Sequence, residues 1–153
     1  MSDCIVKDRL TDAMKESMRN RDKPRLGAIR LALAELKRIE VDEKSLNDQR
    51  ALAVLDKMVK QRHDAIGQFE SAGRTDLANQ EKLELDVLTD FLPTPLSETE
   101  IAELIDFAIK NTGASSMADM SKVMSVIKPQ AQGRADISSI SKIVKSRLLL
   151  RDI

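Results

Sequence analysis

The side chains best suited to holding a ligand are cations near the C-terminal end of the sequence. Lys142 and Lys145, together with Ser138, recur at spacings of four and three residues, so on a helix they share one face. Such a lysine row is the kind of surface that contacts the phosphate groups of a nucleic acid. Three further cations lie close to this row in the sequence: Lys122, Lys128 and Arg134.

Charge neither supports nor excludes such a contact. The 153 residues contain 25 Lys plus Arg and 25 Asp plus Glu, so the formal net charge is zero and any binding surface must be local. Residues 1–38 and 113–153 each carry +4, whereas 39–92 carry −5 and 97–112 carry −3. The lysine row therefore has two open interpretations, a solvated helix face and a phosphate contact.

One segment contains the residue types of a nucleophilic site. Ser115 and Ser116 lie near Lys122, as in hydrolases that use two serines and a lysine. Ser116, however, occupies a position where the next helix needs a cap, and Ser115 is an ordinary turn residue. We therefore predict capping here and no catalytic residue.

Metal and cofactor sites are not predicted. The only histidine, His63, has no cysteine, histidine or carboxylate cluster at ligand spacing around it, and no glycine-rich phosphate-binding motif occurs. Glu81, Glu84 and Glu100 could pair as carboxylates, but nothing in the sequence gives them the different environments that acid–base catalysis needs. A solvated face is the simpler expectation for them.

The N-terminal residues predict a cytoplasmic protein without a membrane partner. MSDCIVKDRL lacks the apolar core of a signal peptide, and no apolar run approaches the roughly 20 residues of a membrane span. The single cysteine, Cys4, fits a reducing compartment. Trp and Tyr are absent and only three Phe occur, so a platform that stacks unpaired bases is not expected.

Helices must position these side chains, because nearly every segment spaces its apolar residues by three and four. The pattern predicts an all-α, multihelical fold. The first helix spans roughly 3–20, and Asp22 caps the second. The third follows a cap at Ser45 or Asn47 and runs to about residue 71. Thr75 caps a fourth helix with an acidic outer face, formed by Asp76, Glu81, Glu84, Asp86 and Asp90.

The stretch FLPTPLSETE marks a boundary, because two prolines within three residues cannot continue a helix. We predict a four-helix N-terminal unit over 1–92, a proline-containing linker over 93–96 and a three-helix C-terminal module over 97–153. Ser97 and Glu100 form a capping box at the start of that module.

The remaining helices of the module are delimited by caps. Gly113 ends the fifth helix, Ser116 with Asp119 caps the sixth, Lys128–Pro129 stops it, and Asp136 caps the seventh. The connection between the last two helices is too long for a helix-turn-helix motif. The last helix also lacks Asn, Gln or Arg at base-reading positions, so DNA is not an expected partner.

Several motifs together resemble a known family. They are QFESAGRTDLA, FLPTPLSETEI, TGASSMADMSKVM and the GRAD elbow at residues 133–136. In this order and at these spacings they are similar to the GatB/YqeY family, specifically its free-standing YqeY-like members. The resemblance extends over essentially the whole chain.

The resemblance implies a tRNA partner, but it does not imply catalytic activity. Larger relatives are B subunits of the glutamine-dependent amidotransferase that acts on misacylated tRNA, and their C-terminal tail, which contacts tRNA, is similar to this chain. The chemistry lies elsewhere in those enzymes, so activity as a carbon–nitrogen ligase with glutamine as amido-N-donor is implied only as kinship. Gly133, Arg134 and Asp136 match the elbow as structural residues as much as contacts, and Lys142 follows in the basic helix.

We therefore expect a non-catalytic module that binds tRNA or associates with a tRNA-charging or amidotransferase enzyme, with no cofactor. The expected contacts are Arg134, Lys142, Lys145, Lys122 and Lys128. The alternative is a protein-interaction adaptor without nucleic-acid binding. Its contacts would be the flexible side chains of methionines: Met14 and Met18, or Met117, Met120 and Met124. The sequence predicts no oligomeric state.

Overall fold

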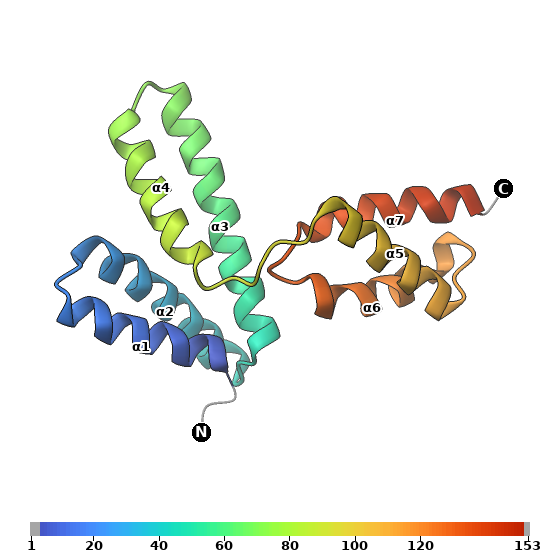
Figure 1. Ribbon diagram of the computed structural model, residues 1–153, viewed down its shortest axis with the longest axis horizontal. Coiled ribbons are helices and arrows are strands. Elements are labelled where there is room, and N and C mark those ends of the chain that lie inside the picture. Colours follow the sequence, from blue (N-terminus) through green and yellow to red (C-terminus); the bar gives the residue numbers. More distant parts are fainter. Residues whose placement is uncertain (1–3, 152–153) are drawn as a thin grey trace. The chain divides into compact units, whose positions relative to one another are not determined.

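The computed structural model describes residues 4–151, which form seven α-helices and a short 3-10 helix, with no strand among them (Figure 1). The predicted all-α, multihelical fold is confirmed. In chain order the elements are α1 (Ile5–Arg19), α2 (Lys23–Glu43), α3 (Asp48–Ser71), α4 (Thr75–Thr89), α5 (Glu98–Thr112), η1 (Met117–Asp119), α6 (Met120–Ala131) and α7 (Ile137–Arg151).

The helices form two compact units, which divide after Leu92. The N-terminal unit contains α1 to α4, and the C-terminal unit contains α5 to α7 with η1. Each unit has its own cluster of buried apolar side chains, and no residue belongs to both clusters. Each therefore has the core that a domain needs.

In the N-terminal unit α1 packs on α2, α3 packs on α4, and α2 also contacts α4. Leu10, Ile29, Leu36 and Leu55 are fully buried, and Leu88 is nearly so, so all four helices contribute to one core. Burying a side chain of this size contributes about 1.5–3 kcal/mol. The predicted spacing by three and four thus corresponds to one buried face per helix.

The caps of this unit follow the sequence with one exception. Asp22 and Asn47 each accept a hydrogen bond from the backbone N–H three residues ahead, at 3.3 and 2.9 Å. The predicted cap at Thr75 is wrong, because Thr75 is the first helical residue and Arg74 precedes it without a side-chain cap. Gly73 adopts the left-handed conformation, with φ 74°, and α4 begins two residues after it.

The C-terminal unit begins with the predicted capping box. The hydroxyl of Ser97 accepts from the N–H of Glu100 at 3.1 Å, and the carboxylate of Glu100 accepts from the N–H of Ser97 at 3.2 Å. Gly113 ends α5 in the left-handed conformation, with φ 66°. Ile105, Ile127 and further residues of all three helices form the core.

The predicted end of the sixth helix at Lys128–Pro129 is wrong, because α6 continues through Pro129 to Ala131. Proline fits helical φ, and its missing N–H removes only one bond in this last turn. Ala131 is fully buried, and the N–H of Gln132 donates to the carbonyl of Lys128 at 2.9 Å. Packing of the last turn therefore outweighs the lost bond.

Candidate nucleic-acid interface

The lysine row lies on the exposed face of α7. Ile140, Val144 and Leu148 are buried on the other side of this helix and fix its orientation. Lys142 and Lys145 are exposed, and among residues 4–151 no carboxylate lies within ion-pairing distance of either. As far as the structure describes it, this face is positively charged and has no acidic side chain to neutralise it.

Arg134, by contrast, is already engaged within the C-terminal unit. Its Nε donates to the carbonyl of Thr94 at 2.8 Å, and its Nη2 lies 3.9 Å from a carboxylate oxygen of Glu100. The carbonyl of Arg134 also accepts from the N–H of Leu96 at 2.8 Å. Arg134 thus fastens the proline-containing linker to the elbow before α7, and its guanidinium is only partly accessible to a ligand.

The elbow itself is a turn followed by a helix cap. Gly133 is left-handed, with φ 78°. Asp136 accepts a hydrogen bond from the N–H of Ser138 at 3.1 Å and one from the hydroxyl of Ser139 at 3.0 Å. The carboxylate of Asp136 therefore occupies the position that an anion would take at the start of α7.

Lys122 and Lys128 do not extend the row as one surface. They are six residues apart on α6, so they point about 120° apart around the helix. The Nζ of Lys122 lies 3.9 Å from Asp119, whereas Lys128 is exposed and makes no ion pair with the described residues. The structure thus keeps Lys142 and Lys145 together and leaves Lys128 as a separate exposed cation.

The segment considered as a nucleophilic site is a cap, as predicted. The carboxylate of Asp119 accepts from the N–H of Ser115 at 3.0 Å and of Ser116 at 3.4 Å. The hydrogen bond from Ser115 holds the pKa of Asp119 below its ordinary value. Ser116 and Asp119 thus start η1, which leads into α6. Within the part of the chain that the structure describes, no cluster of His, Cys, Asp or Glu has the arrangement of a metal site.

Two carboxylates assigned to the outer face of α4 lie elsewhere. Glu81 and Glu84 face Arg62 of α3, whose Nε is 3.4 Å from Glu81 and 2.9 Å from Glu84. The three side chains are only 16–22% exposed. The expectation of a solvated face is wrong for these two, because the packing of α4 on α3 turns them towards a cation.

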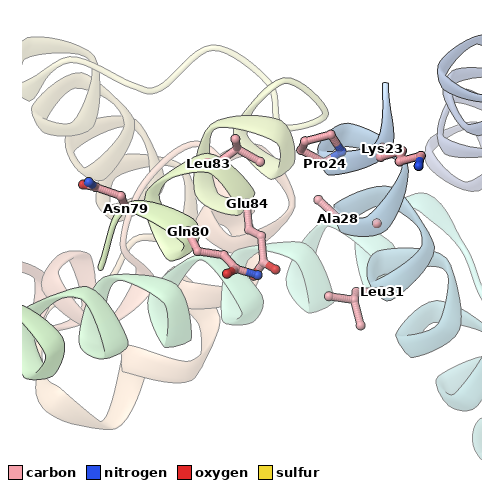
Figure 2. A pocket seen from close by; sticks show the side chains of 9 residues that line it. Lys23, Pro24, Ala28, Leu31, Asn79, Gln80, Leu83 and Glu84 are labelled. Atoms are coloured by element: carbon pink, nitrogen blue, oxygen red, sulfur yellow. The ribbon is translucent and has the colours of Figure 1, made fainter. Parts of the chain in front are cut away.

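A groove lies between α2 and α4, with a volume of about 800 Å³. Figure 2 shows Leu31 on α2 and Leu83 on α4 on opposite sides of it. Both leucines are exposed, at 49% and 41%. Pro24, Gly27 and Ala28 add to its apolar lining.

A second set of exposed cations lies on α2, and no role was predicted for it. Lys23, Arg30 and Lys37 recur every seven residues and therefore share one helix face. All three are exposed, and no described carboxylate lies within ion-pairing distance. Their seven-residue spacing could have identified them in the sequence. The prediction for this helix used only the spacing of its apolar residues.

No helix in residues 4–151 combines the length and the apolar character needed to cross a membrane. The family model described as "Yqey-like protein" matches residues 7–148.

Three curated proteins are similar to this chain. A Pyrenophora tritici-repentis protein named "Altered inheritance of mitochondria protein 41, mitochondrial" is 33% identical over 148 residues, covering 92% of this chain and 80% of that protein. A Candida glabrata protein of the same name is 37% identical over 91 residues, covering 57% of this chain and 50% of that protein. An uncharacterized Schizosaccharomyces pombe protein is 33% identical over 90 residues, covering 58% and 70%. Because the family model spans nearly the whole chain, this protein belongs to the YqeY-like family.

Proposed function

We propose that this protein is a non-catalytic, tRNA-associated module whose C-terminal unit contacts the phosphate backbone through α7. The observation that carries the proposal is the pairing state of the lysines. Lys142 and Lys145 share one exposed face of α7, with no described carboxylate within ion-pairing distance. Unpaired lysines in a row gain most from a polyanion, because binding releases the counterions held along its phosphates.

Binding of this kind would fix position without reading sequence. The chain has only three Phe and no Trp or Tyr, so bases have little aromatic surface to stack on. Asp136 caps the start of α7, which further removes base-reading donors from its first turn. The resemblance to the tail of tRNA amidotransferase B subunits is the reason for choosing tRNA among polyanions.

Two of the predicted contacts are weaker candidates in this proposal. Arg134 is engaged with Thr94, and Lys122 lies near Asp119. Lys128 is exposed on the neighbouring helix and is retained as a secondary contact. The predicted cytoplasmic location stays a prediction, and two of the relatives carry the word "mitochondrial" in their names.

The test is the affinity for tRNA of the full chain and of Lys142→Glu/Lys145→Glu, measured by filter binding at a low and a higher salt concentration. We expect the variant to bind roughly tenfold or more weakly at low salt, because two phosphate contacts become repulsive. The slope of log affinity against log salt should also fall by about two.

The matched control is Lys44→Glu/Lys110→Glu, which makes the same change in net charge on two exposed lysines outside α7. It should retain nearly wild-type affinity. Equal losses in both variants would reduce the effect to net charge, and no binding by the wild type at low salt would contradict the proposal.

A protein-interaction role is the second candidate, and the groove between α2 and α4 favours it. The methionines do not supply its surface in the C-terminal unit, because Met124 is buried and Met117 and Met120 pack against the core. Met18 is 51% exposed. An adaptor would therefore use the N-terminal unit.

A further inference from the structure

The outward face of α2 is basic and has a regular spacing. Lys23, Arg30 and Lys37 are seven residues apart, so they are spaced by about 10 Å along the helix. All are exposed and have no ion-pairing carboxylate among the described residues. Side chains at a seven-residue spacing can all face a second helix that packs alongside the first.

The residues between these cations are small. Gly27 and Ala34 lie on the same face, and both are exposed. A Cβ added at Gly27 would meet nothing within 4 Å, so the fold of the chain itself does not require glycine there. Glycine is among the least favourable residues inside a helix, and small side chains let another backbone approach closely.

The outward face of α4 carries one unpaired carboxylate, Asp86, among the described residues. Asn79, Leu83 and Asp86 recur at spacings of four and three and are exposed. Asp86 has no ion-pairing cation among the described residues. Asp76 and Asp90 lie near the same face, although each already pairs with an arginine of its own unit.

These two faces border one groove. Lys23 lines it from α2 and Asn79 lines it from α4 (Figure 2). Gly27 of α2 also belongs to its lining. The half-exposed side chains of Leu31 and Leu83 lie between the basic and the acidic face. From α2 to α4, the surface is therefore first basic, then apolar at the two leucines, and then acidic.

We propose that this surface binds a second copy of the chain about a two-fold axis. A two-fold rotation brings the basic face of α2 against the acidic face of α4 in the other copy, and the reverse contact forms at the same time. Leu31 and Leu83 of both copies meet at the centre, where they lose contact with water. The surface is complementary to itself in charge and in apolar content.

A nucleic acid fits this surface poorly. Leu31 and Leu83 offer no donor to a phosphate, and Asp86 would repel one. The basic face of α2 needs an acidic partner, and α4 of a second copy provides one. The inference does not depend on tRNA binding, because α7 belongs to the other unit.

The test measures mass by sedimentation equilibrium from about 1 µM to about 1 mM, the range of weak homodimers. The wild type should approach twice the monomer mass as concentration rises. Lys23→Glu/Arg30→Glu/Lys37→Glu makes both faces acidic, and Asn79→Lys/Asp86→Lys makes both basic, so each variant alone should remain a monomer. Mixed in equal amounts, the two variants should form a heterodimer, because each face of one variant is then opposite in charge to each face of the other.

The control is Lys15→Glu/Arg19→Glu/Lys44→Glu, which changes charge equally at exposed positions away from the groove and should still dimerise. Leu31→Ser/Leu83→Ser should weaken dimerisation at least tenfold while leaving helix content unchanged, because both side chains are already exposed. A wild type that stays monomeric throughout overturns the proposal. The proposal is also overturned if the mixture of the two variants stays monomeric, or if Lys23→Glu/Arg30→Glu/Lys37→Glu dimerises like the control.

Discussion

The two units use their charged side chains in different ways. In the N-terminal unit, side chains pair with each other across helices. Lys7 of α1 lies 3.0 Å from Glu40 of α2, and Arg62 of α3 lies 2.9 Å from Glu84 of α4. Charge in this unit therefore connects neighbouring helices.

In the C-terminal unit, several charged groups bind the backbone. Asp119 and Asp136 each accept from a backbone N–H at a helix start, and Arg134 donates to the carbonyl of Thr94. Ion pairs also occur in this unit, and they join Arg147 with Asp106, Lys122 with Asp119 and Arg134 with Glu100. Of the lysines on α6 and α7, only Lys122 lies within ion-pairing distance of a described capping carboxylate, at 3.9 Å from Asp119.

This difference gives a physical reason for the unpaired lysine row. The segment 113–153 contains few acidic residues, and those described at the starts of η1 and α7 are caps. The lysines of α7 are left without an ion-pairing partner among residues 4–151. The basic face of α2 is also unpaired, because no described carboxylate lies within ion-pairing distance of Lys23, Arg30 or Lys37.

The largest expected effect comes from breaking the pairing in the N-terminal unit. Arg62→Ala leaves Glu81 and Glu84 close together without a cation, and it should lower the free energy of unfolding of this unit by about 2 kcal/mol. Urea denaturation with hydrogen exchange resolved by unit would measure this. The C-terminal unit should keep its protection.

A matched variant identifies the cause of that loss. Adding Glu81→Gln/Glu84→Gln to Arg62→Ala removes the repulsion and should recover part of the stability. If Arg62→Ala alone leaves stability unchanged, the pairing is only incidental, and the contrast between the two units disappears.

A smaller effect is expected from releasing the linker of the C-terminal unit. Arg134→Ala removes the donor to Thr94 and should cost about 1 kcal/mol, with faster exchange of the N–H of Leu96. Affinity for tRNA should change less than in Lys142→Glu/Lys145→Glu. A larger loss of affinity would make Arg134 a direct contact, as the sequence suggested.

The smallest effect concerns the caps at low pH. The hydrogen bond from the N–H of Ser97 lowers the pKa of Glu100 below its ordinary value of 4.5, so this carboxylate stabilises the fold above that pH and loses its contribution as the pH falls through the folded value. Glu100→Gln should melt slightly below the wild type near pH 7. The difference in Tm should shrink at about pH 3. A constant difference across this range would mean that charge has no part in this cap.

Much of the fold was predictable because its signals are local. The apolar spacing defined seven helices, and the capping residues Asp22, Asn47 and Ser97 with Glu100 act as predicted. The predictions at Thr75 and Pro129 were wrong. Thr75 is the first helical residue of α4 and not its cap, and the burial of Ala131, which depends on packing against other helices, keeps α6 helical past Pro129.

The candidate surfaces were less predictable than the helices. Spacing alone placed Lys142 and Lys145 together, but it grouped them with Arg134, which packing directs to Thr94. It also assigned Glu81 and Glu84 to solvent, although α3 provides them with Arg62. Distances between residues remote in sequence depend on how helices pack, and periodicity contains no information on that.

By itself, therefore, the sequence determined which residues form helices, which face of each is apolar and where most caps lie, because each of these depends on neighbours within a few positions. Only the tertiary structure decided which charges have partners. A charged side chain finds its partner on another helix or on the backbone of a distant turn. Among the described residues, packing leaves the cations of the α7 row and of the basic face of α2 without one.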